Sequence, residues 1–320
     1  MDFVAQTLSL PDQIRWASAI DVPDLDPATA AVVAGMGGSG ISGDFAAVLA
    51  EAEGRRVHVT KGYSLPLWAQ TERPLVVAVS YSGNTEETLS VARQALEAGL
   101  SVVGISSGGE LADLPLAAHI EVPGGNQPRA SLGYLLGTLA RVLVSASVLT
   151  DPGLDEARAV VEAVHERSAP PTLVEAMRGR IPIVWAGSAL TAPVAQRWKT
   201  QINENAKAPA WWSVLPEADH NEIVGWESLA QLTTERLVVV PLRDASDHPR
   251  VGLRFDHTRR LTQPYVAWSD EVWSQGEGRL ARMLGLAAVA DLVTLALADR
   301  YGVDPESVAL IEDLKHLLKG

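Results

Sequence analysis

The feature that most constrains this chain is an alternation of short apolar runs with longer helical patterns. In the first half, runs rich in β-branched residues occur at 29–35, 56–62, 74–80, 101–106 and 119–124. Between two of them, residues 84–99 have helical spacing, with Glu86 and Glu87 placed early, where the positive end of a helix favours them. Strands that alternate with helices form a parallel sheet covered on both faces, so the sequence predicts an α/β fold.

The second half of the chain repeats this layout more loosely. Apolar runs at 181–188, 236–244 and 264–270 predict further strands. The stretch 181–195 has the same order of strand, small-residue turn and helix as 29–43, without the rich glycine loop. The sequence therefore predicts two similar lobes, each a parallel β-sheet flanked by helices in a three-layer αβα sandwich.

The boundaries of the lobes follow from the stretch between the two series. Residues 151–180 have helical spacing interrupted by Pro170 and Pro171, which indicates a helical connection. The first lobe is then expected over 1–150 and the second over 181–320.

Two parts of the second lobe have different patterns. Segment 245–262 is expected to be an irregular or short-helical insertion. The last residues have amphipathic helical spacing, so a helix is expected to start near Asp304 or Pro305.

Charge and cysteine content exclude several function classes. The chain has 26 Lys and Arg against 39 Asp and Glu, which gives a formal net charge of −13. A basic face cannot easily form from this balance, so no nucleic-acid partner is expected. A local pocket can still be positive, so a small anionic ligand is compatible with the charge. With no cysteine, the chain has no disulfide, thiolate metal site or cysteine nucleophile.

Membrane insertion and export are not expected either. The first residues lack the charged-then-apolar order of a signal peptide. The apolar stretch 130–150 is long enough to span a bilayer, but Arg141 lies in its middle, where a charge is costly. Its many small residues suit a buried helix or a subunit interface. The sequence therefore predicts a cytoplasmic protein without a membrane partner.

A glycine-rich turn follows the first apolar run. The letters GMGGSG at 35–40 fit the G-x-G-x-x-G pattern of dinucleotide-binding loops. In such folds an acidic residue ends the second strand and holds the adenosine ribose. Here Thr60 or Lys61 takes that position, so a nicotinamide cofactor is not favoured.

Hydroxyl side chains gather after the third apolar run. Ser80, Ser82 and Thr85 lie on a turn that leads into a helix N-terminus. Three hydroxyls, the N–H groups of residues 83–85 and the positive end of a helix make an anion site that suits a phosphate monoester. The alternative is an ordinary helix cap by Ser, Thr or Asn.

These two loops together resemble the sugar isomerase (SIS) domain family. Members of that family bind phosphosugars at the carboxyl ends of a parallel sheet. The stretch 80–88 is similar to the phosphate loop of the family, and 35–40 is similar to its first loop. The resemblance implies that Gly37 and Gly38 let the backbone approach a sugar phosphate and that Ser39 lies beside the sugar.

The densest polar and aromatic stretch is 201–227. Asp219, His220 and Glu222 are close together there, but their spacing matches no common set of metal ligands and offers one histidine, so no metal is expected. Proton transfer between C1 and C2 of a sugar phosphate needs a carboxylate whose pKa burial can raise, and a cation or histidine for ring opening. Glu204 and His220, with a lysine, could supply these groups.

This stretch resembles one branch of the SIS family, the bifunctional phosphoglucose/phosphomannose isomerases. The resemblance implies that Glu204 is the base and that His220 acts in ring opening. It also implies that Lys315 in the last helix reaches the sugar and that Arg129 joins the phosphate or enediolate site. In the resembled enzymes the histidine comes from the other subunit, which implies a homodimer with a shared site and no cofactor.

The leading hypothesis is an aldose–ketose isomerase. It would interconvert glucose 6-phosphate, mannose 6-phosphate or both with fructose 6-phosphate through an enediol or enediolate. Two alternatives stay open: a phosphosugar-binding SIS regulator without catalysis, and an isomerase of another phosphosugar, such as an amino-sugar or heptose phosphate.

Overall fold

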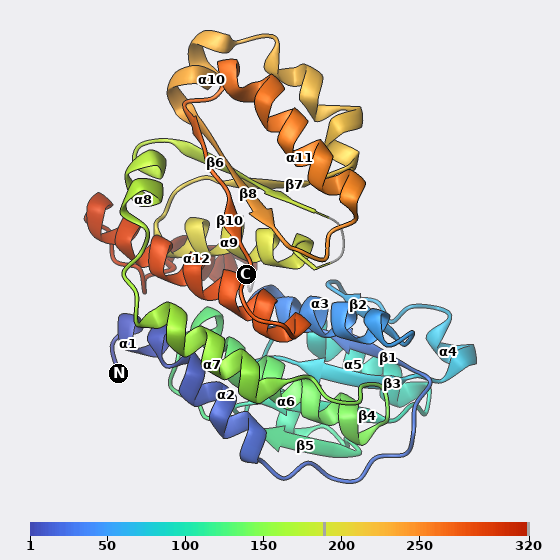
Figure 1. The fold of residues 1–320 in the computed structure, drawn as a ribbon. Helices are drawn as coiled ribbons and strands as arrows, with labels where there is room; N and C mark the ends of the chain where they lie inside the picture. Colours follow the sequence, from blue (N-terminus) through green and yellow to red (C-terminus); the bar gives the residue numbers. More distant parts are fainter. Residues whose placement is uncertain (188–189, 319–320) are drawn as a thin grey trace. The chain divides into compact units, whose positions relative to one another are not determined.

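The computed structural model describes residues 1–187 and 190–318. They form two compact units (Figure 1). The first unit contains Met1–Ala163 and Gln275–Gly285, and the second contains Val164–Ser274 and Leu286–Gly320. The chain therefore passes from one unit to the other at three places, one of them inside the helix α12 (Arg279–Tyr301).

The first unit is built on a five-stranded parallel sheet. Its strands, in sheet order, are β2 (Arg56–Thr60), β1 (Ala30–Ala34), β3 (Leu75–Val79), β4 (Val102–Ser106) and β5 (Ala118–Glu121). Every residue of β1, β3 and β4 is buried, which explains why these segments are continuously apolar or small. The five strands predicted for this half are confirmed, although β5 starts one residue earlier and ends three residues earlier than expected.

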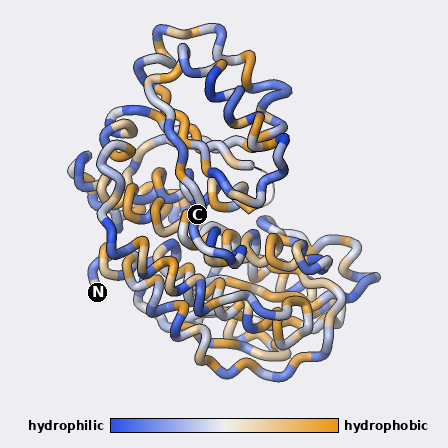
Figure 2. The backbone as a smooth tube through the Cα atoms, viewed as in Figure 1, coloured by the Kyte–Doolittle hydropathy of each residue, from blue (hydrophilic) through white to orange (hydrophobic). Residues whose placement is uncertain are grey.

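Helices cover both faces of this sheet. Neighbouring strand residues point to opposite faces, and Val32 and Val33 of β1 show this. Val32 lies in one apolar cluster with Leu89 of α5 (Glu86–Glu97), whereas Val33 touches α3 (Gly37–Ala52). The first unit is thus a helix–sheet–helix sandwich, and hydrophobic residues follow its strands in Figure 2.

The other helices of the first unit are short or lie outside these two. They are α1 (Phe3–Leu8), α2 (Leu10–Ala19), α4 (Ala69–Glu72), α6 (Leu132–Ser145) and α7 (Leu154–His165), with 3-10 turns at η1 (Glu110–Asp113) and η2 (Pro128–Ala130).

The apolar stretch 130–150 contains α6, a helix of 14 residues that ends at Ser145. Arg141, in its middle, donates a hydrogen bond to the carbonyl of Ile20 at 3.1 Å. Of the helices in the described part of the chain, α12 alone is long and apolar enough to cross a bilayer, and 78% of its most apolar window is buried in the protein. Burial inside a fold accounts for an apolar composition of this kind.

The second unit also has a parallel sheet, with fewer full strands. Its order is β10 (Val272–Trp273), β8 (Leu237–Arg243), β6 (Ile181–Ala186) and β7 (Trp211–Val214), and β9 (Trp268–Ser269) pairs with β8 as well. Because β6 occupies one side of β8, both β9 and β10 lie along its other side. They form an edge strand interrupted at residues 270–271. The α/β fold with two parallel sheets flanked by helices is therefore confirmed.

The helices of the second unit follow the order of the chain. They are α8 (Pro171–Met177), α9 (Ala192–Asn205), α10 (Ala230–Arg236), α11 (Pro249–Thr262) and α13 (Ala309–Leu318), with 3-10 turns at η3 (Glu217–His220), η4 (Glu222–Trp226) and η5 (Gln263–Tyr265).

The expectation of an irregular or short-helical segment at 245–262 is wrong. Residues Pro249–Thr262 form α11, a helix of 14 residues. His248 starts it, because its Nδ1 accepts a hydrogen bond from the Arg250 N–H at 3.1 Å. Its buried stripe combines Val251 and Phe255 with two threonines, so the apolar period is weak in the sequence.

Three other elements also differ from expectation. The strand expected at 264–270 is reduced to β9, because η5 occupies the residues around Pro264. Strand β7, at the tryptophan pair Trp211–Trp212, is not among the expected strands, and Trp211 is 55% exposed. The last helix starts at Ala309 instead of Asp304 or Pro305.

Candidate active site

The glycine turn joins β1 to α3. Gly37 and Gly38 are the first residues of α3, and Ser39 is buried in its first turn. A Cβ on Gly38 would lie 3.0 Å from the carbonyl oxygen of Pro128 and 3.4 Å from the Cα of Arg129. The glycine therefore allows the turn that contains Arg129 to approach the start of α3. The first N–H groups of α3 have no partner within the helix, as at any helix N-terminus.

The serine loop follows β3 and ends at α5. Ser80 is fully buried, and its Oγ lies 2.8 Å from the Oγ1 of Thr85. The N–H of Thr85 donates to Ser80 Oγ at 3.4 Å. Ser82 is exposed and its Oγ accepts from the N–H of Asn84 at 3.2 Å. Thr85 occupies the N-cap position without a side-chain capping bond, which leaves the first N–H groups of α5 for a ligand or solvent.

The two loops contact each other. The N–H of Tyr81 donates to Ser39 Oγ at 3.4 Å. Because β1 and β3 are neighbours in a parallel sheet, their carboxyl ends bring both loops to the same edge. The structure thus joins Ser39, Ser80 and Thr85 into one cluster of hydroxyl groups, with two helix N-termini beside it.

Gly83 fixes the shape of the serine loop. Its φ is +70°, and a Cβ at this position would lie 1.7 Å from the carbonyl oxygen of Gly108. We expect Gly83→Ala to lower the free energy of unfolding by about 2–5 kcal/mol, from the left-handed backbone and the clash together. Gly54 is the matched control, because its φ is also +70° but nothing lies within 4 Å of its Cβ position. Urea denaturation measures the free energy of unfolding of both variants, and Gly54→Ala should lower it by only about 1 kcal/mol. Equal losses in the two variants would contradict the packing argument.

Arg129 lies in η2, next to the glycine turn. The residue is 4% exposed, and its guanidinium carbon lies 4.4 Å from the centroid of the Phe3 ring. Its Nη1 donates to Gln127 Oε1 at 3.5 Å. The N–H of Gln127 in turn donates to Gln6 Oε1 at 2.7 Å. Helix α1 and its neighbours therefore hold a buried cation close to the start of α3.

Lys61 takes the place at which a dinucleotide-binding fold would have a carboxylate. It follows β2 and forms an ion pair with Asp44 of α3. Burial raises the pKa of the Asp44 carboxyl, and the nearby Lys61 ammonium opposes this shift. Lys61 therefore connects the end of β2 to α3 through an ion pair.

Glu204 lies in the last turn of α9 and is half-buried. The backbone around it is well fixed: Lys207 Nζ donates to the carbonyl of Glu204. Asn205 is buried and donates to Thr294 Oγ1 of α12 at 3.1 Å. Glu204 therefore lies at the end of α9, and hydrogen bonds hold its own backbone carbonyl and the next residue in place.

His220 is the last residue of η3 and is exposed, but the residues beside it are anchored. The side chain of Asp219 is 7% exposed and accepts hydrogen bonds from Arg254 at 3.0 Å and from Thr258 at 2.7 Å, both on α11. Two residues after His220, the side chain of Glu222 accepts from the Nε1 of Trp185 at 3.2 Å and from the hydroxyl of Ser213.

These contacts give Asp219 and Glu222 roles that differ from metal ligation. They hold the backbone on both sides of His220 against α11 and against strands β6 and β7. Sequence reasoning noted both carboxylates but missed this role, because Arg254 and Thr258 lie on the helix that it did not predict. Within the described residues, no three His, Asp or Glu side chains gather in a way that could hold a metal ion.

Lys315 lies in α13, and no described residue of that helix is buried. Glu204, His220 and Lys315 thus come from three different elements of the second unit: α9, η3 and α13. Within the described residues, the side chains of His220 and Lys315 make no hydrogen bond or ion pair with one another.

Comparison with known proteins gives the family of the chain. Residues 167–318 match the family described as the bacterial phospho-glucose isomerase C-terminal SIS domain. Over 96% of this chain and 95% of its own length, the bifunctional phosphoglucose/phosphomannose isomerase of Aquifex aeolicus is 36% identical. The protein of the same name from Caldicellulosiruptor bescii is 35% identical over 97% of each chain.

A solved structure shows the same fold at lower identity. The tagatose-6-phosphate ketose/aldose isomerase of Escherichia coli is 15% identical, with a TM-score of 0.74 over 95% of each chain. The hydroxyl cluster at the sheet edge, the match of 167–318 and the identity over nearly the whole chain point to one conclusion. The chain belongs to the SIS-domain family of bifunctional phosphoglucose/phosphomannose isomerases.

Proposed function

We propose that this enzyme interconverts glucose 6-phosphate, mannose 6-phosphate or both with fructose 6-phosphate. The observation that carries the proposal is the pair of joined loops at the carboxyl ends of β1 and β3. Buried Ser39 and Ser80, with Thr85 and two helix N-termini, offer hydroxyl and N–H groups of the kind that hold a phosphate monoester. In this proposal, Gly37 and Gly38 let the backbone approach the phosphate, and Ser82 adds an exposed hydroxyl.

The proposed reaction is a proton transfer between two carbons of the open-chain sugar. Glu204 removes the proton from C2 of the aldose, and the electron pair of that C–H bond forms the double bond of an enediolate. The same carboxyl returns a proton to C1, while the C2 hydroxyl gives up its proton to become the carbonyl of the ketose and O1 gains a proton, so that none is gained or lost overall. No electron leaves the substrate, so the reaction consumes no oxidant or reductant.

The other site residues take supporting roles in this proposal. His220 transfers the proton that opens the sugar ring, and Lys315 contacts the sugar oxygens. Arg129 stabilises negative charge on the phosphate or on the enediolate oxygen.

Turnover of fructose 6-phosphate by the purified full chain tests the function. Glucose 6-phosphate and mannose 6-phosphate are quantified separately after treatment with EDTA. Formation of both products supports a bifunctional isomerase, and formation of one narrows the substrate. If fructose 6-phosphate binds and neither product forms, a regulator or an isomerase of another phosphosugar replaces this proposal.

The contacts of Asp219 with Arg254 and Thr258, which hold the turn that contains His220, give a second prediction. We expect Asp219→Asn to lower kcat by about 10- to 100-fold with a smaller change in KM, because a displaced catalytic group loses its alignment. The loss should be much smaller for a four-carbon aldose phosphate that cannot close a six-membered ring, since ring opening is then not needed. Arg250→Gln on the same helix is the control, because its side chain is exposed and makes no described contact. An equal loss on both substrates would contradict a role through His220.

We also propose that the enzyme acts in the cytoplasm as a homodimer with shared active sites. The support in the structure is α13, which exposes Leu310, Leu314 and Leu317 to 55–85% and therefore has an apolar face to cover. Mixing inactive Glu204→Gln and His220→Ala chains after partial denaturation should restore part of the activity, because a mixed dimer would contain one intact site. No recovery in mixtures proved to contain mixed dimers would contradict shared sites.

A further inference from the structure

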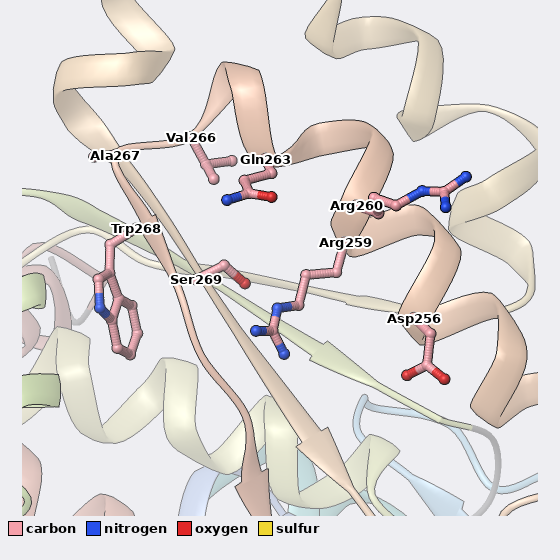
Figure 3. A pocket seen from close by; sticks show the side chains of 8 residues that line it. All are labelled: Asp256, Arg259, Arg260, Gln263, Val266, Ala267, Trp268 and Ser269. Atoms are coloured by element: carbon pink, nitrogen blue, oxygen red, sulfur yellow. The ribbon is translucent and has the colours of Figure 1, made fainter.

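A cavity lies in the second unit, between the C-terminal half of α11 and strand β9 (Figure 3). Its volume is about 550 Å³. The lining residues come from α11, η5 and the strand that follows: Asp256, Arg259, Arg260, Gln263, Val266, Ala267, Trp268 and Ser269. The volume falls in the range of about 300–1,000 Å³ that is usual for small-molecule sites.

This cavity is separate from the groups proposed for catalysis. Trp268 and Ser269 pair with Val238 and Val239, at the first half of β8. Strand β7, which leads to η3 and His220, lies at the opposite edge of the sheet, beyond β6. The cavity therefore needs an explanation of its own.

Polar side chains from α11, η5 and β9 line the cavity. In the view of Figure 3, the guanidinium of Arg259 extends toward the hydroxyl of Ser269, the amide of Gln263 lies above them, and the carboxylate of Asp256 points away from the guanidinium. Arg260 points away from this group. The Oγ of Ser269 is buried and has no hydrogen-bond partner among the described residues. A buried hydroxyl without a partner is unusual in a folded protein.

The carboxylates around Arg259 are already shared with another cation. Arg259 Nη1 lies 3.3 Å from Glu271 Oε1, and the same oxygen accepts from Arg243. Arg243 also pairs with Asp256 at 3.1 Å, so it is the main partner of both carboxylates. A guanidinium has five N–H donors, and the ion pair with Glu271 involves one nitrogen of Arg259, whose side chain is 39% exposed. The group thus holds two cations, Arg243 and Arg259, against two carboxylates, and Arg260 points away from it.

We propose that this cavity is a second binding site for a small phosphate ester. Arg259 would bind the phosphate through two parallel N–H donors, and Ser269 would donate its hydroxyl to the same group. Gln263 and Asp256 can bond to hydroxyl groups on the rest of the ligand. Both inorganic phosphate and a phosphosugar offer the oxyanion, and only the phosphosugar can also use Gln263 and Asp256.

Calorimetric titration of the full chain tests the site. Because the serine loop is the other candidate for phosphate, the titrations use a Ser82→Ala/Thr85→Ala background with inorganic phosphate or fructose 6-phosphate as the probe. We expect one remaining site per chain, at least a tenfold weaker affinity after Arg259→Gln, and a clear loss after Ser269→Ala. Arg260→Gln is the matched control and should leave the affinity unchanged. A second readout locates the ligand: the indole N–H resonance of Trp268, assigned by its loss in Trp268→Phe, should shift on binding.

Several results would overturn the proposal. It fails if neither probe binds in this background, or if Arg259→Gln and Ser269→Ala leave the affinity unchanged. It also fails if Arg259→Gln and Arg260→Gln weaken binding equally, because that result indicates non-specific attraction to positive charge. Ser269→Ala removes a hydroxyl without a described partner, so this variant should fold even if Arg259→Gln does not. A phosphosugar is the ligand if Gln263→Ala weakens binding of fructose 6-phosphate only, and free phosphate is the ligand if both probes bind equally and Gln263→Ala has no effect.

Discussion

Glu204→Gln is expected to lower kcat for fructose 6-phosphate by about 10³-fold or more, with little change in KM. Glutamine keeps the size of the side chain and its place in the last turn of α9, but its amide cannot accept the carbon-bound proton. Loss of a general base typically costs about 10²–10⁴ in rate, and here the same group acts in both halves of the reaction. Exchange of the C1 hydrogen of fructose 6-phosphate with deuterated solvent should stop in the same variant.

Two further measurements make this prediction specific. Glu227→Gln, at an exposed position of the same stretch, should leave kcat unchanged. Binding of fructose 6-phosphate to Glu204→Gln, measured by calorimetry, should remain close to the wild-type value. Wild-type turnover in Glu204→Gln would remove Glu204 from the mechanism, whatever the substrate of the enzyme proves to be.

The second large effect concerns stability. Asp291→Ala is expected to lower the free energy of unfolding by about 3–5 kcal/mol, because it leaves a buried arginine without its carboxylate. Arg197 of α9 and Asp291 of α12 are 3% and 2% exposed, and Arg197 Nη2 lies 3.2 Å from Asp291 Oδ1. Gln201 Nε2 donates to the same oxygen at 2.6 Å. The group ties α9, whose last turn contains Glu204, to α12.

A double variant separates charge from packing in this prediction. Arg197→Met with Asp291→Leu replaces the ion pair by apolar side chains of similar size and should recover most of the stability lost by Asp291→Ala. Urea denaturation followed by circular dichroism measures all three proteins. If Asp291→Ala lowers the free energy of unfolding by less than about 1 kcal/mol, water reaches Arg197 and the Arg197–Asp291 ion pair is not needed for stability.

The first sheet and its loops could be predicted from the sequence, for a physical reason. Strands buried on both faces must be apolar at every position, and β1, β3 and β4 are. The loops that follow such strands need glycine and hydroxyl residues in order to turn and to bind an anion. The sequence therefore predicts that Ser80, Ser82 and Thr85 gather on one turn. The 2.8 Å contact of Ser80 with Thr85 confirms that these two are close, and the role of all three stays a prediction.

The second unit was harder to predict because its elements do not follow simple apolar periods. Helix α11 buries two threonines in its inner stripe, which hides the pattern. Strands β9 and β10 have two residues each, so neither can show an alternation. The anchor of Asp219 depends on Arg254 and Thr258, 35 and 39 residues away in the sequence. A contact at that separation has no local signal in a single sequence.

The course of α12 has a consequence for dissecting this enzyme. The helix starts in the first unit and ends in the second, and the segment before it supplies the N–H groups of Glu277 and Gly278 that bind Glu156 of α7. A protein truncated after Ala163 would lose that segment, and Glu156 of α7 would lose these hydrogen bonds. A single truncation therefore cannot separate the two units. A fusion protein that exchanges them would have to keep residues 275–285 together with the N-terminal half.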